Sequence, residues 1–477
     1  MLRLKNTLTR KLEEFKPLKD KTVRIYACGP TVYGNIHIGN FRTFVAVDIL
    51  QRYLKYLGYD VRYVMNITDV DDKIIRGLKQ SGKSLEEYTG FYTSQFLEDL
   101  ERLNIQMPDV LPRATGHIPE MLDLMNRLDQ HGHTYKGDGS VYFRIASFPE
   151  YGMLSGSKLD GNQAGARVDV DEYDKADARD FVLWKATKEA GEPSWDSPYG
   201  PGRPGWHLEC SAMSMKYLGE SFDIHCGGVD LIFPHHENEI AQSQGATGRP
   251  FVKTWLHVEF LLVEGEKMSK SKGNFYTLRD LVERGYSAQA IRFLLLSVPY
   301  STQLNFTFDE LRARQNSLER LQNFRRRVEE ARTSERGLRS GEGEESRKAR
   351  DAIVSAKAAF EAGMDDDLNT SAALAAVFDL VRDINIAMDS GELNEEDRLA
   401  TLEFLDAVDS VLGIPGREKA LEISSELRTR VDELIKQRHA ARRDRDFARA
   451  DRIRDELAAQ GVMLEDTAQG TRWKLKQ

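Results

Sequence analysis

The stretch Thr22-Val-Arg-Ile-Tyr-Ala-Cys-Gly29 opens the part of the chain that decides the fold. Its apolar and β-branched residues predict a strand. Apolar residues then recur at helical spacing from about Gly39 to Leu57, where Gly58 offers a stop, and Val61-Arg-Tyr-Val-Met-Asn-Ile67 predicts a second strand. A strand, a helix and a strand in this order predict a βαβ unit of a doubly wound, Rossmann-like parallel sheet, with a ligand site at the strand ends.

Two short motifs point to nucleotide phosphates. His37-Ile-Gly-Asn40 lies between the first strand and the helix, whose free N–H groups favour anions. Far downstream, Lys267-Met-Ser-Lys-Ser271 lies in a Gly- and Ser-flanked stretch that predicts a mobile loop. Its lysines can close over a departing pyrophosphate and balance the developing charge.

In this order, the two motifs resemble the ATP-binding signatures of class I aminoacyl-tRNA synthetases. The resemblance implies ATP accompanied by Mg²⁺ and a group of catalytic residues: His37, Asn40, Lys267 and Lys270. It also implies ATP contacts by His37, Gly39, Lys267, Met268, Ser269, Lys270 and Ser271. Asn40 departs from the HIGH-type pattern, because an amide can donate a hydrogen bond to phosphate but cannot become cationic.

Four scattered residues form a chemically reasonable metal set. Two thiols (Cys28, Cys210), an imidazole (His235) and a carboxylate (Glu239) suit tetrahedral zinc, and His235 and Glu239 are four apart in a segment of helical spacing. Their spacing matches no CxxC-type signature, so spacing alone leaves the site open.

Four longer stretches resemble cysteinyl-tRNA synthetases, and the resemblance runs nearly end to end. They are Cys28-Gly-Pro-Thr-Val-Tyr33, Asn66-Ile-Thr-Asp-Val-Asp-Asp-Lys73, Gly205-Trp-His-Leu-Glu-Cys-Ser-Ala-Met213 and Phe233-Pro-His-His-Glu-Asn-Glu239. The resemblance implies that L-cysteine is joined to tRNA(Cys) through a cysteinyl adenylate. It also implies one zinc ion per chain on Cys28, Cys210, His235 and Glu239, and a substrate pocket with Thr68, Trp206, His225 and Asp230.

Zinc is a sensible selector of cysteine. Shape alone separates cysteine from serine by only ~1–3 kcal/mol, whereas a ~10⁴-fold preference requires about 5.5 kcal/mol. Zinc binds a thiolate directly and a serine hydroxyl poorly. An editing domain is therefore not expected.

Rival interpretations follow from single features. His236-Glu-Asn-Glu-Ile240 begins like the HExxH motif of a zinc protease, but Ile240 replaces the second histidine.

Cys226 is interpreted as a buried or incidental thiol. A ligase that joins cysteine to an amino sugar would share the motifs, but the chain beyond Ile414 would be superfluous to it. A non-catalytic, synthetase-like RNA-binding paralogue would be expected to lack a ligand or lysine, and none is missing.

Composition is that of a globular protein: 477 residues, 40% hydrophobic and 30% charged. The absence of long apolar stretches predicts no membrane contact and a cytoplasmic location, and three cysteines argue against a disulfide framework. The net charge of −9 does not by itself favour tRNA binding. The Arg-rich C-terminal segment is interleaved with acidic residues, so it reads equally well as a solvated helix face or as an RNA contact. We expect a monomer.

The pattern and the resemblance together predict five parts, and the stem-contact role is what the resemblance implies. We expect a split catalytic domain (1–115 and 200–262), an insertion (116–199), a loop and stem-contact region (263–310), an all-α helical bundle (311–413) and a small anticodon-binding domain (414–477). The resemblance assigns the last part, in which Trp473 could stack on an unpaired base.

Overall fold

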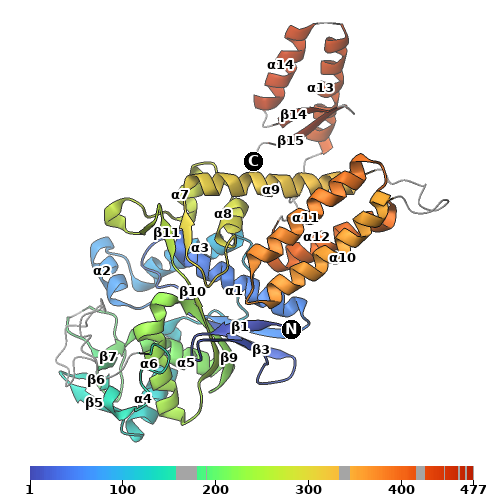
Figure 1. Ribbon diagram of the computed structural model, residues 1–477. Coiled ribbons are helices and arrows are strands. Elements are labelled where there is room, and N and C mark those ends of the chain that lie inside the picture. The colour runs from blue at the N-terminus through green and yellow to red at the C-terminus, as the bar shows by residue number, and fades with distance from the viewer. Residues whose placement is uncertain are drawn as a thin grey trace. The chain divides into compact units, whose positions relative to one another are not determined.

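The computed structural model describes residues 1–156, 180–189, 191–331, 344–414, 425–444, 446–459, 462–467 and 470–475. The chain forms two compact units, Met1–Pro415 and Gly416–Gln477. The first unit is built on a four-stranded parallel sheet in the order β10-β9-β3-β4 (Figure 1). Its strands are β3 (Thr22–Ala27), β4 (Asp60–Met65), β9 (Phe222–Gly228) and β10 (Val252–Val258).

The predicted βαβ unit is confirmed. Helix α1 (Ile38–Tyr56) joins β3 to β4, and Gly58 follows it with a positive φ of 85°. Most residues of α1 are buried, because the sheet packs on one side of it and helices α8 and α12 pack on the other. A helix covered in this way needs apolar residues on most of its circumference, which explains its low amphipathicity.

The order of the sheet creates the crevice for a ligand. β3 lies between β4, which follows it in sequence, and β9, which is reached only after a long insertion. Where connections leave neighbouring parallel strands in opposite directions, a crevice opens beyond their carboxyl ends. The segments after β3, β4, β9 and β10 begin with Cys28, Asn66, Val229 and Glu259, and these segments meet there.

The insertion forms a sheet of its own. Its antiparallel strands follow the order β5-β6-β7-β8, and α2 is tied to it because Asp72 pairs with Lys185 and Arg203. Burial alone would raise the pKa of Asp72, but these two cations outweigh it and lower the pKa. The elements from β4 to β10 are α2 (Asp72–Ser81), α3 (Leu85–Arg102), α4 (Ile118–Gln130), β5 (Thr134–Gly137), β6 (Ser140–Phe143), β7 (Phe181–Ala186), β8 (Gly202–Pro204), α5 (Trp206–Leu218) and α6 (Glu237–Thr247).

A small three-stranded sheet follows β10 and carries Lys267, the first residue of the second phosphate motif. Its order is β12-β11-β13, in which β11 pairs antiparallel with β12 and parallel with β13. The elements are β11 (Leu261–Val263), β12 (Glu266–Lys267), α7 (Leu278–Glu283), α8 (Ala288–Leu295) and β13 (Leu304–Phe306). A two-stranded sheet of β1 (Arg3–Asn6) and β2 (Lys11–Glu14) lies at the N-terminus.

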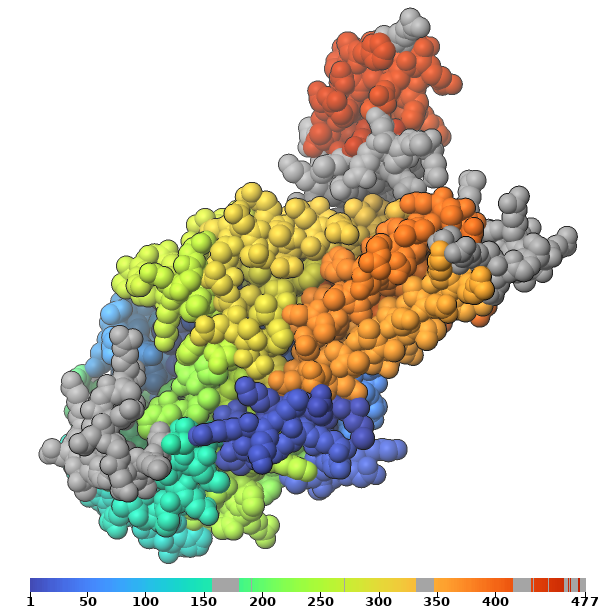
Figure 2. Space-filling view, in the orientation of Figure 1, coloured from blue at the N-terminus to red at the C-terminus, as the bar shows by residue number. Residues whose placement is uncertain are grey.

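The predicted helices beyond β13 are present. They are α9 (Phe308–Glu330), α10 (Glu344–Asp365), α11 (Thr370–Asp389) and α12 (Glu395–Leu412). In Figure 2 the orange surface of α10 to α12 is continuous with the yellow surface of α9, consistent with contacts of α9 with α11 and α12. Asn369 caps α11 by accepting from Ala372 N, as a polar residue at a helix start should.

The end of α12 is fastened to α1 by buried charges. Arg292 donates to Asp48 Oδ2 at 2.5 Å and to the carbonyl of Leu412 at 2.8 Å, and both charged side chains are fully buried. Arg52, one turn along α1, donates from its Nε to the same oxygen, Asp48 Oδ2, at 2.8 Å.

The second unit has a small core of its own, formed by Val431, Ile435, Ile453, Leu457 and Val462. Its elements are α13 (Ser425–Arg443), α14 (Phe447–Ala459), β14 (Val462–Thr467) and β15 (Gly470–Leu475). The side chain of Trp473, the predicted stacking residue, lies outside the described part. No described helix has the length and apolar character needed to cross a bilayer.

Candidate metal and nucleotide site

One pocket of about 390 Å³ lies at the carboxyl ends of the parallel strands and joins the two groups of predicted site residues. Its wall includes three of the four predicted metal ligands, Cys28, Cys210 and His235. It also includes residues of both phosphate motifs: His37, Gly39, Asn40, Lys267 and Met268. The predicted ligands therefore open onto the same space as the predicted nucleotide site.

The four predicted ligands converge although they come from three separate segments. Cys28 follows β3, Cys210 is on α5, and His235 and Glu239 lie at the start of α6. Cys28 Sγ is 3.8 Å from Cys210 Sγ and 3.6 Å from Glu239 Oε1. His235 Nε2 is 3.1 Å from the same carboxylate oxygen.

These distances suit a tetrahedral ion. With Zn–S of ~2.3 Å and Zn–O of ~2.1 Å, the edges of the tetrahedron are ~3.8 Å between sulfurs and ~3.6 Å between sulfur and oxygen. His235 Nε2 is also buried and has no partner in hydrogen-bond geometry among the described residues. A buried nitrogen of this kind is expected to have a partner, and a metal ion at the centre of the four atoms would supply one. The residues present therefore fit zinc.

The local backbone holds Cys28 in place. Gly29 N donates to Asn66 Oδ1 at 2.9 Å, and a Cβ added at Gly29 would come within 1.6 Å of the Asn66 carbonyl oxygen. Only glycine allows β3 and the segment after β4 to approach so closely. The helix predicted to carry His235 differs in detail: α6 begins only at Glu237, so Glu239 is in its first turn. His235 lies in the kinked segment Ile232–His236 before it, where Phe233 has an extended backbone with φ −136° and ψ 130°.

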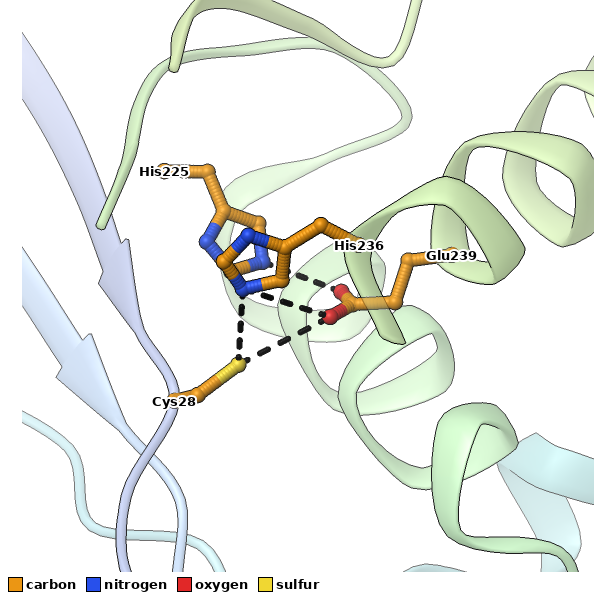
Figure 3. A group of neighbouring side chains, drawn as sticks. All are labelled: Cys28, His225, His236 and Glu239. Carbon is orange, nitrogen blue, oxygen red and sulfur yellow. Dashed lines mark hydrogen bonds and ion pairs between the residues drawn. The ribbon is translucent and has the colours of Figure 1, made fainter. Parts of the chain in front are cut away.

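A second group of possible ligands lies behind the first. Cys28, His225, His236 and Glu239 also bring their ligand atoms within 4.8 Å of one another (Figure 3). His225 Nε2 is 3.0 Å from Glu239 Oε2, and His236 Nε2 is 3.4 Å from Cys28 Sγ. The other nitrogen of His236 contacts His257 Nε2 at 2.7 Å. His225 therefore contacts Glu239 Oε2, whereas His236 Nε2 lies 4.0 Å from Oε1, the oxygen that Cys28 and His235 also approach.

Two of the four ligands, Cys210 and Glu239, have lowered pKa values that favour their anionic forms. Burial alone would raise the pKa of Cys210, but the neighbouring Cys28 thiol and His235 lower it to about 6. Likewise, burial would raise the pKa of Glu239, but His225 and His235 lower it to about 2. Burial and the adjacent Cys210 raise the pKa of Cys28. A divalent cation would stabilise both thiolates.

The two phosphate motifs are in contact. His37 caps α1, and its Nδ1 accepts from Asn40 N at 3.3 Å. A Cβ added at Gly39 would come within 2.7 Å of Met268 Cε, so Met268 lies directly on the backbone of the first motif. Asn274 shapes the second motif, because its Oδ1 accepts from Ser269 N at 2.8 Å and its Nδ2 donates to Lys267 O at 3.3 Å. Ser269 and Ser271 hydrogen-bond to each other at 2.7 Å, and the side chain of Lys270 lies outside the described part.

Three of the four residues predicted to bind the amino acid line the pocket: Thr68, Trp206 and Asp230. The Trp206 ring is 39% exposed and lies 4.2 Å from the His235 ring, beside the ligand set. His225, predicted to line the same pocket, is instead fully buried behind Glu239, and its ring stacks on Trp255. Cys226 is a buried thiol on β9, and burial raises its pKa.

Sequence reasoning missed part of the histidine cluster. His207 Nδ1 lies 2.8 Å from His235 Nδ1, and His257 links His236 to Thr7 Oγ1 at 2.7 Å. The available signal was that several histidines lie near the ligands in sequence. His257 is on β10, however, and its contact with His236 can be recognised only once the position of β10 in the sheet is known.

Comparisons with known proteins find three family matches along the chain. Residues 14–316 match the family described as tRNA synthetases class I (C) catalytic domain, residues 359–415 match the DALR domain, and residues 424–473 match the cysteinyl-tRNA ligase anticodon binding domain. Curated relatives named cysteine-tRNA ligase include those of Solibacter usitatus, 56% identical, and Koribacter versatilis, 51% identical, each with 100% of both chains covered.

The fold has solved counterparts. A methionyl-tRNA synthetase from Mycobacterium tuberculosis, in complex with methionyl-adenylate, superposes with a TM-score of 0.60 at 16% identity. The match covers 83% of this chain and 91% of that one. The predicted Rossmann-like fold class is thereby confirmed.

Proposed function

The chain belongs to the cysteinyl-tRNA ligase family of class I synthetases and charges tRNA(Cys) with cysteine, and we propose that a zinc ion on Cys28, Cys210, His235 and Glu239 selects the amino acid. The observation that carries the proposal is the single pocket shared by the ligand set and both phosphate motifs. Such a pocket brings a metal-bound sulfur and the α-phosphate of ATP into one space.

The ion would supply a direct bond to the substrate thiolate, which serine cannot match. The chain's own residues would do the rest of the recognition. Trp206 lines the pocket beside the His235 ring, and the Asp230 carboxylate is suited to the substrate ammonium. Thr68 is held with its hydroxyl donating to the buried Glu209 at 2.8 Å, so its oxygen can accept from the ammonium group.

Activation needs the cysteine carboxylate to attack the α-phosphate of ATP, with pyrophosphate leaving. No covalent enzyme intermediate is required, so positioning and charge stabilisation carry the rate. His37, Asn40 and the N-terminus of α1 would hold the phosphates, and Lys267 and Lys270 would balance the charge on the leaving group beside Mg²⁺. A hydroxyl of the terminal adenosine of tRNA then attacks the adenylate, and AMP leaves.

The two rival functions lose support. A cysteine:amino-sugar ligase has no use for an anticodon-binding domain, which residues 424–473 match. A non-catalytic paralogue is disfavoured because every predicted ligand and both lysines are present. A monomeric state, a cytoplasmic location and the five domain boundaries stay predictions from the sequence.

The test is aminoacylation of purified tRNA with cysteine and serine in parallel, with metal content measured on the same protein. We expect one zinc per chain and charging by cysteine at least ~10⁴-fold better than by serine. Zinc-free protein that still selects cysteine, or transfer of cysteine to an amino sugar in place of tRNA, would overturn the proposal.

A further inference from the structure

Arg42 is a buried cation whose acceptors are backbone carbonyls. It lies on α1, three residues after Gly39, and is 1% exposed. Its Nη1 donates to the carbonyls of Glu259 and Phe260 at 2.9 and 2.8 Å. Its Nη2 donates to the carbonyls of Pro299, at 3.2 Å, and Thr302. Burial lowers the pKa of Arg42 to about 10, although Glu259 acts in the opposite direction.

These carbonyls belong to the two segments that lead into strands β11 and β13 of the sheet that carries Lys267. Glu259 and Phe260 join β10 to β11, and β11 pairs with β12, which ends at Lys267. The segment from Pro299 to Thr302 leads into β13, the other neighbour of β11. The two segments also hydrogen-bond to each other: Glu259 N donates to Tyr300 O at 2.9 Å, and Leu304 N donates to Phe260 O at 3.1 Å.

The first phosphate motif and the lysine loop are close neighbours, so their contact depends on where these two segments lie. Met268 packs so closely on Gly39 that a single added methyl group would collide with it. Lys267 Nζ lies 5.1 Å from the centre of the Phe260 ring, and the Phe260 carbonyl is one of the acceptors of Arg42. One guanidinium therefore connects the α1 turn that follows Gly39 with the residue on which Lys267 rests.

We propose that Arg42 is a positioning residue for adenylate formation: it fixes the distance between the His37–Asn40 turn and the Lys267 loop, so that both reach the same ATP. The inference rests on the ATP roles proposed above. A planar guanidinium with five donors can serve four carbonyls in two segments, whereas a lysine ammonium has three donors at one point. Misplacement of reacting groups by about 1 Å can cost ~10²-fold in rate.

The test compares Arg42→Met and Arg42→Lys with Arg52→Met. Arg52 is a matched control, since it is on the same helix, is 8% exposed and also donates to backbone carbonyls, those of Asn104 and Ser410. Cysteine-dependent ATP–pyrophosphate exchange would give kcat and the KM for ATP and for cysteine. Calorimetry with a non-hydrolysable ATP analogue would give its Kd, and thermal unfolding would give Tm.

For Arg42→Met we expect kcat/KM for ATP to fall at least ~30-fold and the analogue Kd to rise, with the KM for cysteine within about twofold of wild type. For Arg42→Lys, kcat/KM for ATP should lie between the values for wild type and Arg42→Met. Arg52→Met should lower Tm but leave the KM for ATP unchanged. If Arg42→Met does not fold, the same contrast is read from Arg42→Lys.

The inference is overturned if the Arg42 variants keep the wild-type KM for ATP and analogue Kd, or lose activity toward ATP and cysteine equally, as Arg52→Met would by destabilisation alone. If the wild-type protein shows normal cysteine-dependent exchange, such a result overturns only the positioning role of Arg42 and leaves the proposed function intact. Wild-type protein with no cysteine-dependent exchange would overturn the proposed function, and the positioning role with it.

Discussion

Replacing Cys210 by serine tests the metal site with the smallest change of shape. Cys210 is buried on α5, and its Sγ is 3.8 Å from Cys28 Sγ, the separation that two thiolates on one zinc require. Serine keeps the size of the side chain but offers a weakly acidic hydroxyl in place of a thiolate, so we expect zinc content to fall well below one per chain.

The magnitude follows from what remains without the ion. A pocket that uses shape alone separates cysteine from serine by ~10- to 200-fold, whereas the complete site should reach ~10⁴-fold. The ratio of kcat/KM for cysteine over serine in pyrophosphate exchange should therefore fall by about 50- to 1000-fold in Cys210→Ser.

Cys226→Ser is the matched control. Cys226 is equally buried and lies on β9 outside the ligand set, so the same substitution should cost ~1–3 kcal/mol of stability for an unpaired hydroxyl and leave zinc content and selectivity intact. The reasoning is refuted if Cys210→Ser retains a full complement of zinc and full selectivity, or if it loses zinc and still rejects serine as well as the wild type does.

Three further results are expected. Lys267→Ala should slow pyrophosphate exchange by at least ~10²-fold without changing zinc content or the Kd for cysteine, because it removes charge stabilisation only while pyrophosphate leaves the α-phosphate; an unchanged exchange rate would contradict this. Arg292→Met should lower the free energy of unfolding by ~3–5 kcal/mol, measured by urea denaturation, since it removes a buried partner of Asp48; a loss below ~1 kcal/mol would show that Arg52 suffices. For Asp72, whose pKa is lowered by two ion pairs against the effect of burial, the stabilising contribution is complete above the ordinary aspartate pKa and is lost as the pH falls through the lower folded value. The stability difference between wild type and Asp72→Asn, at most about 1 kcal/mol because the side chain is partly exposed, should thus be largest near neutral pH and vanish in strong acid; a difference that grows on acidification would contradict the assignment.

The local elements were predictable because each has a local cause. The apolar spacing from Gly39 onward and the stop at Gly58 predicted α1 to within a residue. The kink at Phe233 before α6 was not predicted, because the sequence there has the same spacing as an ordinary helix start.

The role of His225 shows where sequence reasoning ended. The family resemblance implied a pocket residue. Adjacent residues of a strand face opposite sides of the sheet, however, and only the packing of α6 decides which side is the pocket. The structure places its Nε2 against Glu239 Oε2, where it can orient a ligand without contacting the substrate.

The sequence alone determined the fold class, the two phosphate motifs and the chemical types of the four ligands, because strand and helix periodicity and donor chemistry are properties of short segments. The tertiary structure decided that Cys28, Cys210, His235 and Glu239 meet, that three of them line the pocket of the phosphate motifs, and that Arg42 on α1 donates to the carbonyls of Glu259 and Phe260. These are distances between segments up to about two hundred residues apart, and they are fixed only when the sheet order brings the ends of β3, β4, β9 and β10 to one edge.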